Sequence, residues 1–287
     1  NPYSMDWHVI AKELLSKSEH IIAGDFEGFD SSQHSSLISS SINVLVTLTE
    51  HLLDFSQQDL RVMRALGEAL YNSYHCHEGK FFQWTHGMVS GSYFTADVNS
   101  IFVNLAFCVC FLTSQDKKDL NTAVKFWQEC GIVAYGDDHV VSVPSKYLKT
   151  FNQVTLVALF KSINLDYTME DKDTKAEVLS RTIEEVSYLK RKFRYDESFS
   201  RYLGPISVDT ITEMVQWTKK GGDTTSQSIE TMKCALRELS LHDQKTWDYY
   251  YPKFSKALME EAPCNDVYFV AKLPTMVATI DGDYLPY

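Results

Sequence analysis

Apolar residues recur every three or four positions along much of the chain, the spacing that places them on one face of an amphipathic helix. Near the N-terminus, Trp7, Ile10 and Leu14 share such a face. A capping box at Ser56 and Asp59 marks the start of a later helix. The pattern predicts helices over 4–18, 34–53, 56–74, from about 95 onward, and over 145–162, 208–219, 226–241 and 244–261.

Short apolar runs between these helices predict β-strands. Such runs occupy 20–24, 81–84, 132–134 and 140–143. The last two runs flank Gly136, Asp137 and Asp138, and a glycine followed by two aspartates suits a tight turn. The sequence therefore predicts a β-hairpin that carries two adjacent carboxylates at its tip.

Two like charges at one turn are costly unless a cation lies between them. Asp137 and Asp138 are therefore a candidate platform for Mg²⁺, which is commonly held by one or two carboxylates together with substrate phosphates. An ordinary Asp-rich hairpin turn would have the same sequence. Asp25 follows the strand at 20–24, and it could join the pair if the two strands are neighbours in one sheet.

Other polar residues could contact a ligand hydroxyl. Asp30 could do so, although it could equally cap the next helix. Ser90 and Gly91 lie in a loop ahead of the helix that starts near 95. Thr95 and Asn99 are four positions apart, which places both on one face of that helix. They could bind a ligand there or simply occupy its polar face.

Two basic features stand out in the second half of the chain. Lys172 lies in a charged loop at 168–173 among acidic neighbours, as a solvated surface lysine would. The segment 187–194 alternates apolar and basic residues, which predicts a strand with Leu189 and Phe193 on one side. Its cations could lie against a phosphate backbone, and they are Lys190, Arg191, Lys192 and Arg194.

The composition bounds the class of protein. With 287 residues, 44% of them hydrophobic and 13% aromatic, the chain can bury a large core in one or two domains. The net charge of −11 argues against a uniformly basic nucleic-acid-binding surface but allows a local basic groove. We expect no membrane-spanning segment and no signal peptide, and therefore a soluble chain. The six cysteines lack CxxC spacing, which predicts reduced thiols.

The order of these residues resembles motifs A to E of the RNA-dependent RNA polymerases of picorna-like positive-strand RNA viruses. The resemblance spans about 21–194 and rests on five segments: Asp25 with Asp30; Ser90, Gly91, Thr95 and Asn99; Tyr135 to Asp138; Asp171 with Lys172; and 189–193. Each segment is weakly specific by itself. The specificity comes from five segments in the same order at compatible spacing.

The resemblance implies an α+β fold, in which a right-hand polymerase palm with an antiparallel sheet flanked by helices precedes a mostly helical thumb. The palm would take up 1–195, with a helical fingers segment at about 33–82, and the thumb 196–287. The family's upstream fingers region, which carries a basic nucleotide-entry motif, has no counterpart in this sequence. We therefore expect a missing N-terminal fingers region and a chain that is inactive alone.

The resemblance also assigns roles to the candidate residues. Asp25 and Asp137, assisted by Asp138, would hold two Mg²⁺ ions, for which Mn²⁺ could substitute. The residues that would position the incoming ribonucleotide at its ribose are Asp30, Ser90, Gly91, Thr95 and Asn99. Lys172 would protonate the pyrophosphate leaving group, and the strand with Lys190, Arg191 and Lys192 would grip the primer end of the RNA.

The implied activity is template-directed RNA synthesis, the two-metal transfer of ribonucleoside triphosphates onto an RNA 3′ end during viral genome replication. The implied partners are an RNA template and primer, ribonucleoside triphosphates and other viral replication proteins, at replication complexes in the host cytoplasm. Two other classes remain open. A metal-dependent glycosyltransferase could use clustered aspartates with a nucleotide-sugar, and a non-catalytic RNA-binding or assembly module would bind RNA without metal.

Overall fold

The computed structural model describes residues 5–169, 178–218, 221 and 223–261, which form two compact units. The sheet unit is Glu13–Leu189. The C-terminal unit combines residues 5–12 with the described residues from 190 onward. Helix α1 (Asp6–Lys17) therefore begins in the C-terminal unit and ends in the sheet unit.

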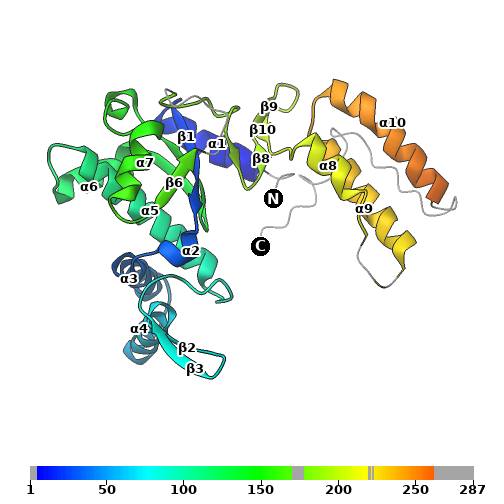
Figure 1. Ribbon diagram of the computed structural model, residues 1–287. Helices are drawn as coiled ribbons and strands as arrows, with labels where there is room; N and C mark the ends of the chain where they lie inside the picture. The colour runs from blue at the N-terminus through cyan, green and yellow to red at the C-terminus, as the bar shows by residue number, and fades with distance from the viewer. Residues whose placement is uncertain (1–4, 170–177, 219–220, 222, 262–287) are drawn as a thin grey trace. The chain divides into compact units, whose positions relative to one another are not determined.

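A four-stranded antiparallel sheet forms the centre of the sheet unit (Figure 1). Its strands, in spatial order, are β4 (Gly131–Tyr135), β5 (Asp138–Ser142), β1 (Ile21–Glu27) and β6 (Asp166–Met169). In β1, Ala23 pairs with Val140 of β5, and Asp25 pairs with Thr168 of β6. The predicted hairpin and the predicted strand at 20–24 are confirmed. Strand β5 of the hairpin pairs directly with β1, and the two are antiparallel.

Helices pack around this sheet and complete its core. They are α2 (Phe29–Ser32), α3 (Ser35–Leu52), α4 (Gln57–Tyr71), α5 (Thr95–Ser114), α6 (Leu120–Glu129), η1 (Ser145–Tyr147) and α7 (Gln153–Lys161). Helix α5 contacts α3, α6, α7 and strand β4. Its Phe102, Phe107 and Phe111 are fully buried, and the rings of Phe107 and Phe160 meet edge to face at 4.9 Å. The architecture is therefore α+β, as the sequence predicts.

The predicted helix at 145–162 is wrong in its first half. Only the short helix η1 forms there, and α7 starts after Asn152. The Asn152 side chain accepts hydrogen bonds of 2.9 Å from the backbone N–H groups of both Val154 and Thr155. An asparagine in this role caps a new helix, because it satisfies N–H groups that have no partner within the helix.

A two-stranded hairpin follows α4 and consists of β2 (Ser73–His77) and β3 (Lys80–Trp84) (Figure 1). The sequence predicts β3 but extends the preceding helix over the start of β2, so half of the hairpin was missed. Its turn residues Glu78 and Gly79 both have positive φ. Aromatic side chains on the hairpin are unusually open to solvent, with Tyr74 77% and Phe81 80% exposed.

The predicted continuous strand at 187–194 is also wrong. The chain forms two strands of two residues, β7 (Ser187–Tyr188) and β8 (Arg191–Lys192). Leu189 and Lys190 lie between them with φ of 52° and 60°. Two successive residues in the left-handed region reverse the chain rather than extend it, so Leu189 and Phe193 do not share one face of a strand.

The C-terminal unit is mostly helical beyond a short hairpin. The hairpin pairs β9 (Arg194–Asp196) with β10 (Arg201–Leu203), and the helices are α8 (Val208–Met214), α9 (Thr224–Leu239) and α10 (Gln244–Glu261). A small core of Ile211, Ala235, Leu239 and Trp247 joins the three helices. Trp7 of α1 packs against this unit's Phe193 and Gly204.

Helix α5 is long and apolar enough to cross a membrane by length and composition alone, a test that a buried core helix also meets. Half of its most apolar window is buried inside the structure. Its hydrophobicity is thus used to pack against α3, α6, α7 and the sheet.

Candidate active site

The tip of the β4–β5 hairpin is the two-residue turn of Gly136 and Asp137. Tyr135 pairs with Asp138 across the turn. Gly136 has φ of 64°, and a Cβ at this position would meet no atom within 4 Å. The glycine is therefore favoured by its backbone conformation, since hairpin turns that match strand twist need positive φ at the first turn position.

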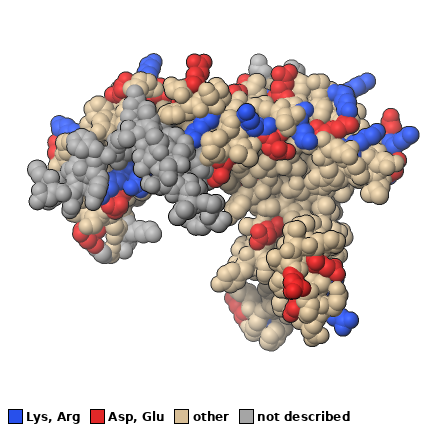
Figure 2. Space-filling model, turned by 180° about the vertical axis from the view of Figure 1, so that it is seen from behind, with Lys and Arg blue, Asp and Glu red and all other residues tan. Residues whose placement is uncertain are grey.

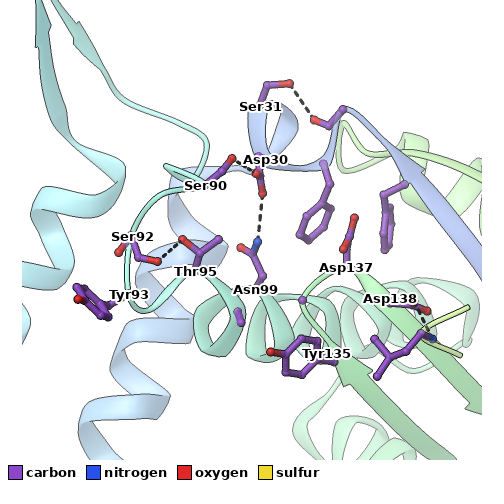
Figure 3. Close-up of a pocket in the computed structure, with 16 residues that line it drawn as sticks. Asp30, Ser31, Ser90, Ser92, Tyr93, Thr95, Asn99, Tyr135, Asp137 and Asp138 are labelled. Carbon is purple, nitrogen blue, oxygen red and sulfur yellow. Dashed lines mark hydrogen bonds between the residues drawn. The ribbon is translucent and has the colours of Figure 1, made fainter. Parts of the chain in front are cut away.

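Hydrogen bonds from other elements hold this turn. The Gly136 N–H donates to the Ser100 hydroxyl of α5 at 2.9 Å. The Leu189 N–H donates to the Asp138 carboxylate at 2.9 Å, and this contact directs that side chain away from Asp137 (Figure 3). The two adjacent carboxylates therefore point in different directions. Asp138 points toward Leu189, and Asp137 points toward the open space beside the turn (Figure 3).

His139 lies directly behind the turn and is 1% exposed. Its Nδ1 is 2.7 Å from the Asp137 carbonyl oxygen, and its Nε2 is 3.1 Å from the Tyr167 hydroxyl. Burial lowers the pKa of His139 to about 4, and the hydrogen bond to the Asp137 backbone opposes this shift. The imidazole is therefore neutral at pH 7.

Asp25 is exposed and lies two residues beyond Ala23, the last residue of β1 that pairs with β5. The strands that carry Asp25 and Asp137 are adjacent, as expected from the sequence. In the part of the chain that the structure describes, neither carboxylate forms an ion pair. Both acids are thus uncompensated by a protein cation there.

The donor atoms suit a hard divalent cation. Asp25, Asp137 and Asp138 offer only carboxylate oxygens, the ligand type that Mg²⁺ and Mn²⁺ take. Among the described residues, no three acidic, histidine or cysteine side chains form a ready-made metal cluster. Asp25, Asp137 and Asp138 therefore do not form such a cluster in this structure, whereas Mg²⁺ usually needs only one or two carboxylates together with water and substrate phosphates. The residues present therefore fit such an ion when water or a phosphate supplies the remaining ligands.

A hydrogen-bonded group of polar residues lies beside the turn (Figure 3). Asp30 accepts from the Ser90 hydroxyl at one carboxylate oxygen and from the Asn99 amide, at 3.1 Å, at the other. Gln33 donates to the Asn99 side-chain oxygen at 2.8 Å and is fully buried. The Gln33 contact fixes the Asn99 amide so that its NH₂ group faces Asp30.

Thr95 and Gly91 have other surroundings. The Thr95 hydroxyl lies 2.8 Å from the Val89 carbonyl and 2.9 Å from the Ser92 carbonyl. Thr95 therefore braces the loop ahead of α5, although it also lines the same cavity as Asn99. Gly91 does not line this cavity, and it borders a separate apolar pocket between α3, α4 and α5.

One open cavity of about 810 Å³ is lined by six of the candidate residues, and Asp25 is not one of them (Figure 3). Its lining includes Asp30, Ser90, Thr95, Asn99, Asp137 and Asp138, and it also includes Phe26, Phe29, Tyr135 and Leu189. Four segments that are distant in sequence therefore meet around one cavity. Its volume suits a small molecule of ordinary size.

The described basic candidates lie outside the lining of this cavity. Lys172 lies outside the described residues. Lys190 and Lys192 are exposed, whereas the Arg191 guanidinium donates to both carboxylate oxygens of Glu238, at 2.7 and 2.9 Å. The Arg191 and Glu238 side chains are only 18% and 12% exposed. Arg191 thus has a partner within the C-terminal unit.

The surface of the sheet unit near α3 and α4 does not carry an excess of positive charge. The segment 33–82 contains five acidic residues against three lysines and arginines. On the face seen in Figure 2, the part that carries these helices shows Asp and Glu at several places and few Lys or Arg. This surface by itself offers little attraction to a polyanion.

Sequence reasoning missed four residues that support the site: Gln33, Ser100, His139 and Tyr167. The pattern offered one usable signal, because His139 directly precedes the apolar run at 140–143. Gln33 and Tyr167 act through contacts with residues far away in the sequence, 66 positions for Gln33 with Asn99 and 28 for Tyr167 with His139. Periodicity carries no information about such pairs.

The fold is that of a viral RNA polymerase. The Sicinivirus 3Dpol RNA-dependent RNA polymerase matches it with a TM-score of 0.74 at 17% identity, over 97% of this chain and 54% of that one. Residues 1–258 match the family described as viral RNA-dependent RNA polymerase. The chain therefore belongs to the viral RNA-dependent RNA polymerase family.

Viral replicase polyproteins are among its relatives in sequence. The replicase polyprotein of Drosophila C virus is 29% identical over 255 residues, and that of acute bee paralysis virus is 30% identical over 275 residues. These matches cover 86% and 93% of this chain but 14% of each polyprotein. The chain thus corresponds to a small portion of each of these polyproteins, and to about half of the solved polymerase.

Proposed function

We propose that this chain is the palm and thumb portion of a polymerase that copies an RNA template into RNA. In the reaction, the 3′ hydroxyl of the growing RNA attacks the α-phosphorus of a ribonucleoside triphosphate, and pyrophosphate leaves. The observation that carries the proposal is the meeting of Asp30, Ser90 and Asn99 with Asp137 around one cavity. Family membership supports the same activity.

Binding of the ribose is the task of the Asp30 group. Both Asp30 oxygens already accept one hydrogen bond each, from Ser90 and Asn99, and each oxygen keeps a further lone pair. A carboxylate fixed in this way can accept a hydrogen bond from a ribose hydroxyl without reorganisation. A 2′-hydroxyl is both donor and acceptor, so the group can distinguish a ribonucleotide from a deoxyribonucleotide.

The aspartates on β1 and at the β4–β5 turn would hold the metal ions that neutralise the charge of the triphosphate. Asp25 and Asp137, with Asp138 assisting, would hold Mg²⁺ or Mn²⁺, and such ions would neutralise the phosphates and orient them for in-line transfer. Asp137 faces the cavity that would receive the triphosphate. Lys172 would donate the proton that the leaving pyrophosphate takes up.

RNA contact would come from exposed cations rather than from the whole basic segment. Of the three residues assigned to the primer end, Lys190 and Lys192 would contact the RNA, while Arg191 would have a structural role in its pair with Glu238. Lysines contact phosphate oxygens by charge, which is independent of base sequence. Residues 1–195 would act as the palm, with 33–82 as part of the fingers, and 196–287 as the thumb.

Full activity would require further polymerase segments that supply the remaining fingers, since the chain covers 54% of the solved polymerase. The exposed Tyr74 and Phe81 of the β2–β3 hairpin support this, because apolar rings so open to solvent are typical of a surface that another part covers. The other partners would be template, primer, ribonucleoside triphosphates and further viral replication proteins, at replication complexes in the host cytoplasm.

The test is RNA synthesis by this chain joined to, or mixed with, an upstream fingers segment from a related polymerase. We expect extension of an RNA primer only with template, ribonucleoside triphosphates and Mg²⁺ or Mn²⁺, and little or none from the chain alone. Hydrolysis of a nucleotide-sugar without extension would favour a glycosyltransferase. RNA binding that needs no metal, without extension, would favour a non-catalytic RNA-binding or assembly module.

A further inference from the structure

A buried histidine, His139 of β5, and a buried tyrosine, Tyr167 of β6, lie on the two strands that flank β1, the strand that carries Asp25. The carbonyl oxygen of Asp137 can only accept, so Nδ1 of His139 must carry the hydrogen of their 2.7 Å contact. In the neutral ring, Nε2 is then an acceptor for the Tyr167 hydroxyl at 3.1 Å. The hydrogen bonds therefore run from Tyr167 through His139 to the turn.

Aromatic rings enclose this pair on several sides. The ring centres of Phe26 and Phe107 are 5.2 and 4.8 Å from that of His139. The Phe26 and Phe160 rings are 5.0 and 4.7 Å from that of Tyr167. In a close-packed interior, side chains have little room to shift, so both polar groups occupy defined positions.

The same hydroxyl end of Tyr167 also rests on the backbone of β1. A Cβ at Gly24 would come within 2.3 Å of the Tyr167 hydroxyl oxygen and Cζ, and within 2.6 Å of the Thr168 carbonyl. Gly24 does not have positive φ, so glycine is required there for space and not for its backbone conformation. Gly24 is the residue directly before Asp25.

We propose that His139 and Tyr167 are positioning residues that set the separation between the main chain at Asp25 and the main chain at Asp137. Tyr167 contacts the first of these segments, and His139 holds the second. Neither side chain lines the cavity that would receive the substrate. The inference rests on the proposed function, because it takes the two aspartates as ligands of one site.

Metal affinity should report this spacing directly. Mg²⁺ demands near-ideal octahedral geometry with short bonds, so a shift of one ligand by a fraction of an ångström weakens binding. The probe is Mn²⁺ alone, titrated into this chain and followed by the loss of the free-ion electron paramagnetic resonance signal. Competition by Mg²⁺ then gives the second affinity.

Tyr167→Phe removes one oxygen atom and its hydrogen bond while it keeps the ring. Its matched control is Tyr147→Phe, which loses a hydrogen bond of 2.5 Å to Glu129 outside the cavity lining. We expect the Mn²⁺ dissociation constant to rise about three- to tenfold for Tyr167→Phe, the factor that one hydrogen bond is worth, and to stay unchanged for Tyr147→Phe. An unchanged constant for Tyr167→Phe, or equal losses in both variants, would overturn the inference.

Substitutions of His139 separate its donor from its bulk. His139→Asn places an amide N–H near the position of Nδ1, whereas His139→Phe keeps an aromatic ring without a donor. Asn should retain more Mn²⁺ affinity than Phe, and adding Tyr167→Phe to His139→Phe should cause no further loss, because the two residues act as one unit. Long-range ¹H–¹⁵N correlation spectra of the unsubstituted chain should place the hydrogen on Nδ1. Fully additive losses of Mn²⁺ affinity in the double variant would show that the two residues do not act as one unit.

Asp137→Asn distinguishes this inference from the proposed function. If Asp137→Asn abolishes Mn²⁺ binding and Tyr167→Phe leaves it unchanged, the metal site stands and the positioning role is wrong. If Asp137→Asn itself leaves Mn²⁺ binding unchanged, the proposed metal site is wrong, and the positioning role is overturned with it.

Discussion

The side-chain amide of Asn99 donates a hydrogen bond of 3.1 Å to Oδ1 of Asp30, 69 residues earlier in the chain. Ser90 occupies the other oxygen of the same carboxylate, and Gln33 fixes the orientation of the amide. The carboxylate is therefore oriented before any ligand arrives. A preorganised acceptor of this kind favours a ligand that brings a hydroxyl to it.

Asn99→Ala should reduce the preference of the active polymerase for ribonucleotides over deoxyribonucleotides. The reason is that a site built around a hydroxyl rejects the substrate without it by leaving polar groups unpaired. We expect the ratio of the two kcat/KM values to fall about tenfold or more, the loss expected from one or more hydrogen bonds. Single-nucleotide incorporation measures it.

Asn104→Ala is the matched control for this change. Asn104 lies on the same helix and donates a hydrogen bond of 2.8 Å to the Ser100 carbonyl, but it does not line the cavity. The ratio should stay the same in this variant. If Asn99→Ala slows both substrates equally, the Asp30 group does not select the sugar.

Lys172→Leu should slow the chemical step of nucleotide transfer by about 10²–10⁴-fold, the contribution of a positioned general acid. Its pH dependence should change as well, because the group that supplies the proton is lost. Single-turnover rapid-quench measurements over a range of pH separate this step from RNA binding. Lys161→Leu, which removes a surface partner of Asp166, serves as the control. A fall in RNA affinity alone would make Lys172 a phosphate contact.

The basic segment around Lys190 should contain two kinds of cation. Lys190→Ala and Lys192→Ala should each weaken RNA binding, and each should lower the slope of log affinity against log salt by about 0.7, the value for one phosphate contact on a single strand. Arg191→Ala should instead lower the free energy of unfolding by about 3 kcal/mol, since the largely buried Glu238 carboxylate loses both hydrogen bonds from the guanidinium.

Binding isotherms at several salt concentrations and urea unfolding curves measure these two effects. The exposed Arg61, on α4, provides the control, and Arg61→Ala should leave the free energy of unfolding unchanged. An Arg191→Ala protein of normal stability that has lost RNA affinity would reverse the assignment.

His242 should make the C-terminal unit sensitive to acid. Burial lowers the pKa of His242 below 6.5, although its hydrogen bond of 2.9 Å to the Ile206 carbonyl opposes the shift. The unfolded chain therefore binds the proton more readily, and the stability contribution is present above pH 6.5 and lost as the pH falls below it. Urea unfolding from pH 7.5 downward should show this decline.

His242→Gln should make the free energy of unfolding fall less steeply as the pH is lowered, because glutamine can still donate to the Ile206 carbonyl but does not titrate. His51→Gln, at an exposed histidine on α3, should leave the pH dependence as it is. Identical pH profiles for the unsubstituted chain and His242→Gln would show that another group is responsible.

Local sequence signals predict the elements that depend on neighbouring residues. The turn at Gly136 needs positive φ and has glycine, and the capping box of Ser56 and Asp59 forms at the start of α4 as predicted. The order of chemically distinctive residues also identifies the family, although no single segment would. These features are encoded within a few positions of each other, where periodicity and turn chemistry apply.

Features that depend on tertiary contacts could not be read in this way. The alternation at 187–194 is typical of a strand, but Leu189 and Lys190 adopt positive φ, which residues other than glycine rarely do. Arg191 looks like a free cation in sequence, and only the fold brings Glu238 to it from 47 positions away. The same holds for Gln33, whose partner Asn99 is 66 positions distant.

The central claim is that Asp25 and Asp137 act together on one metal-dependent transfer of a nucleotide. Mg²⁺-dependent single-nucleotide extension of an RNA primer, by the chain complemented with an upstream fingers segment, tests it most directly. Asp25→Asn and Asp137→Asn should each abolish extension while urea unfolding and RNA binding stay close to normal, and the exposed Asp116→Asn should extend like the unsubstituted protein. Extension by either the Asp25→Asn or the Asp137→Asn protein at an undiminished rate would contradict the account.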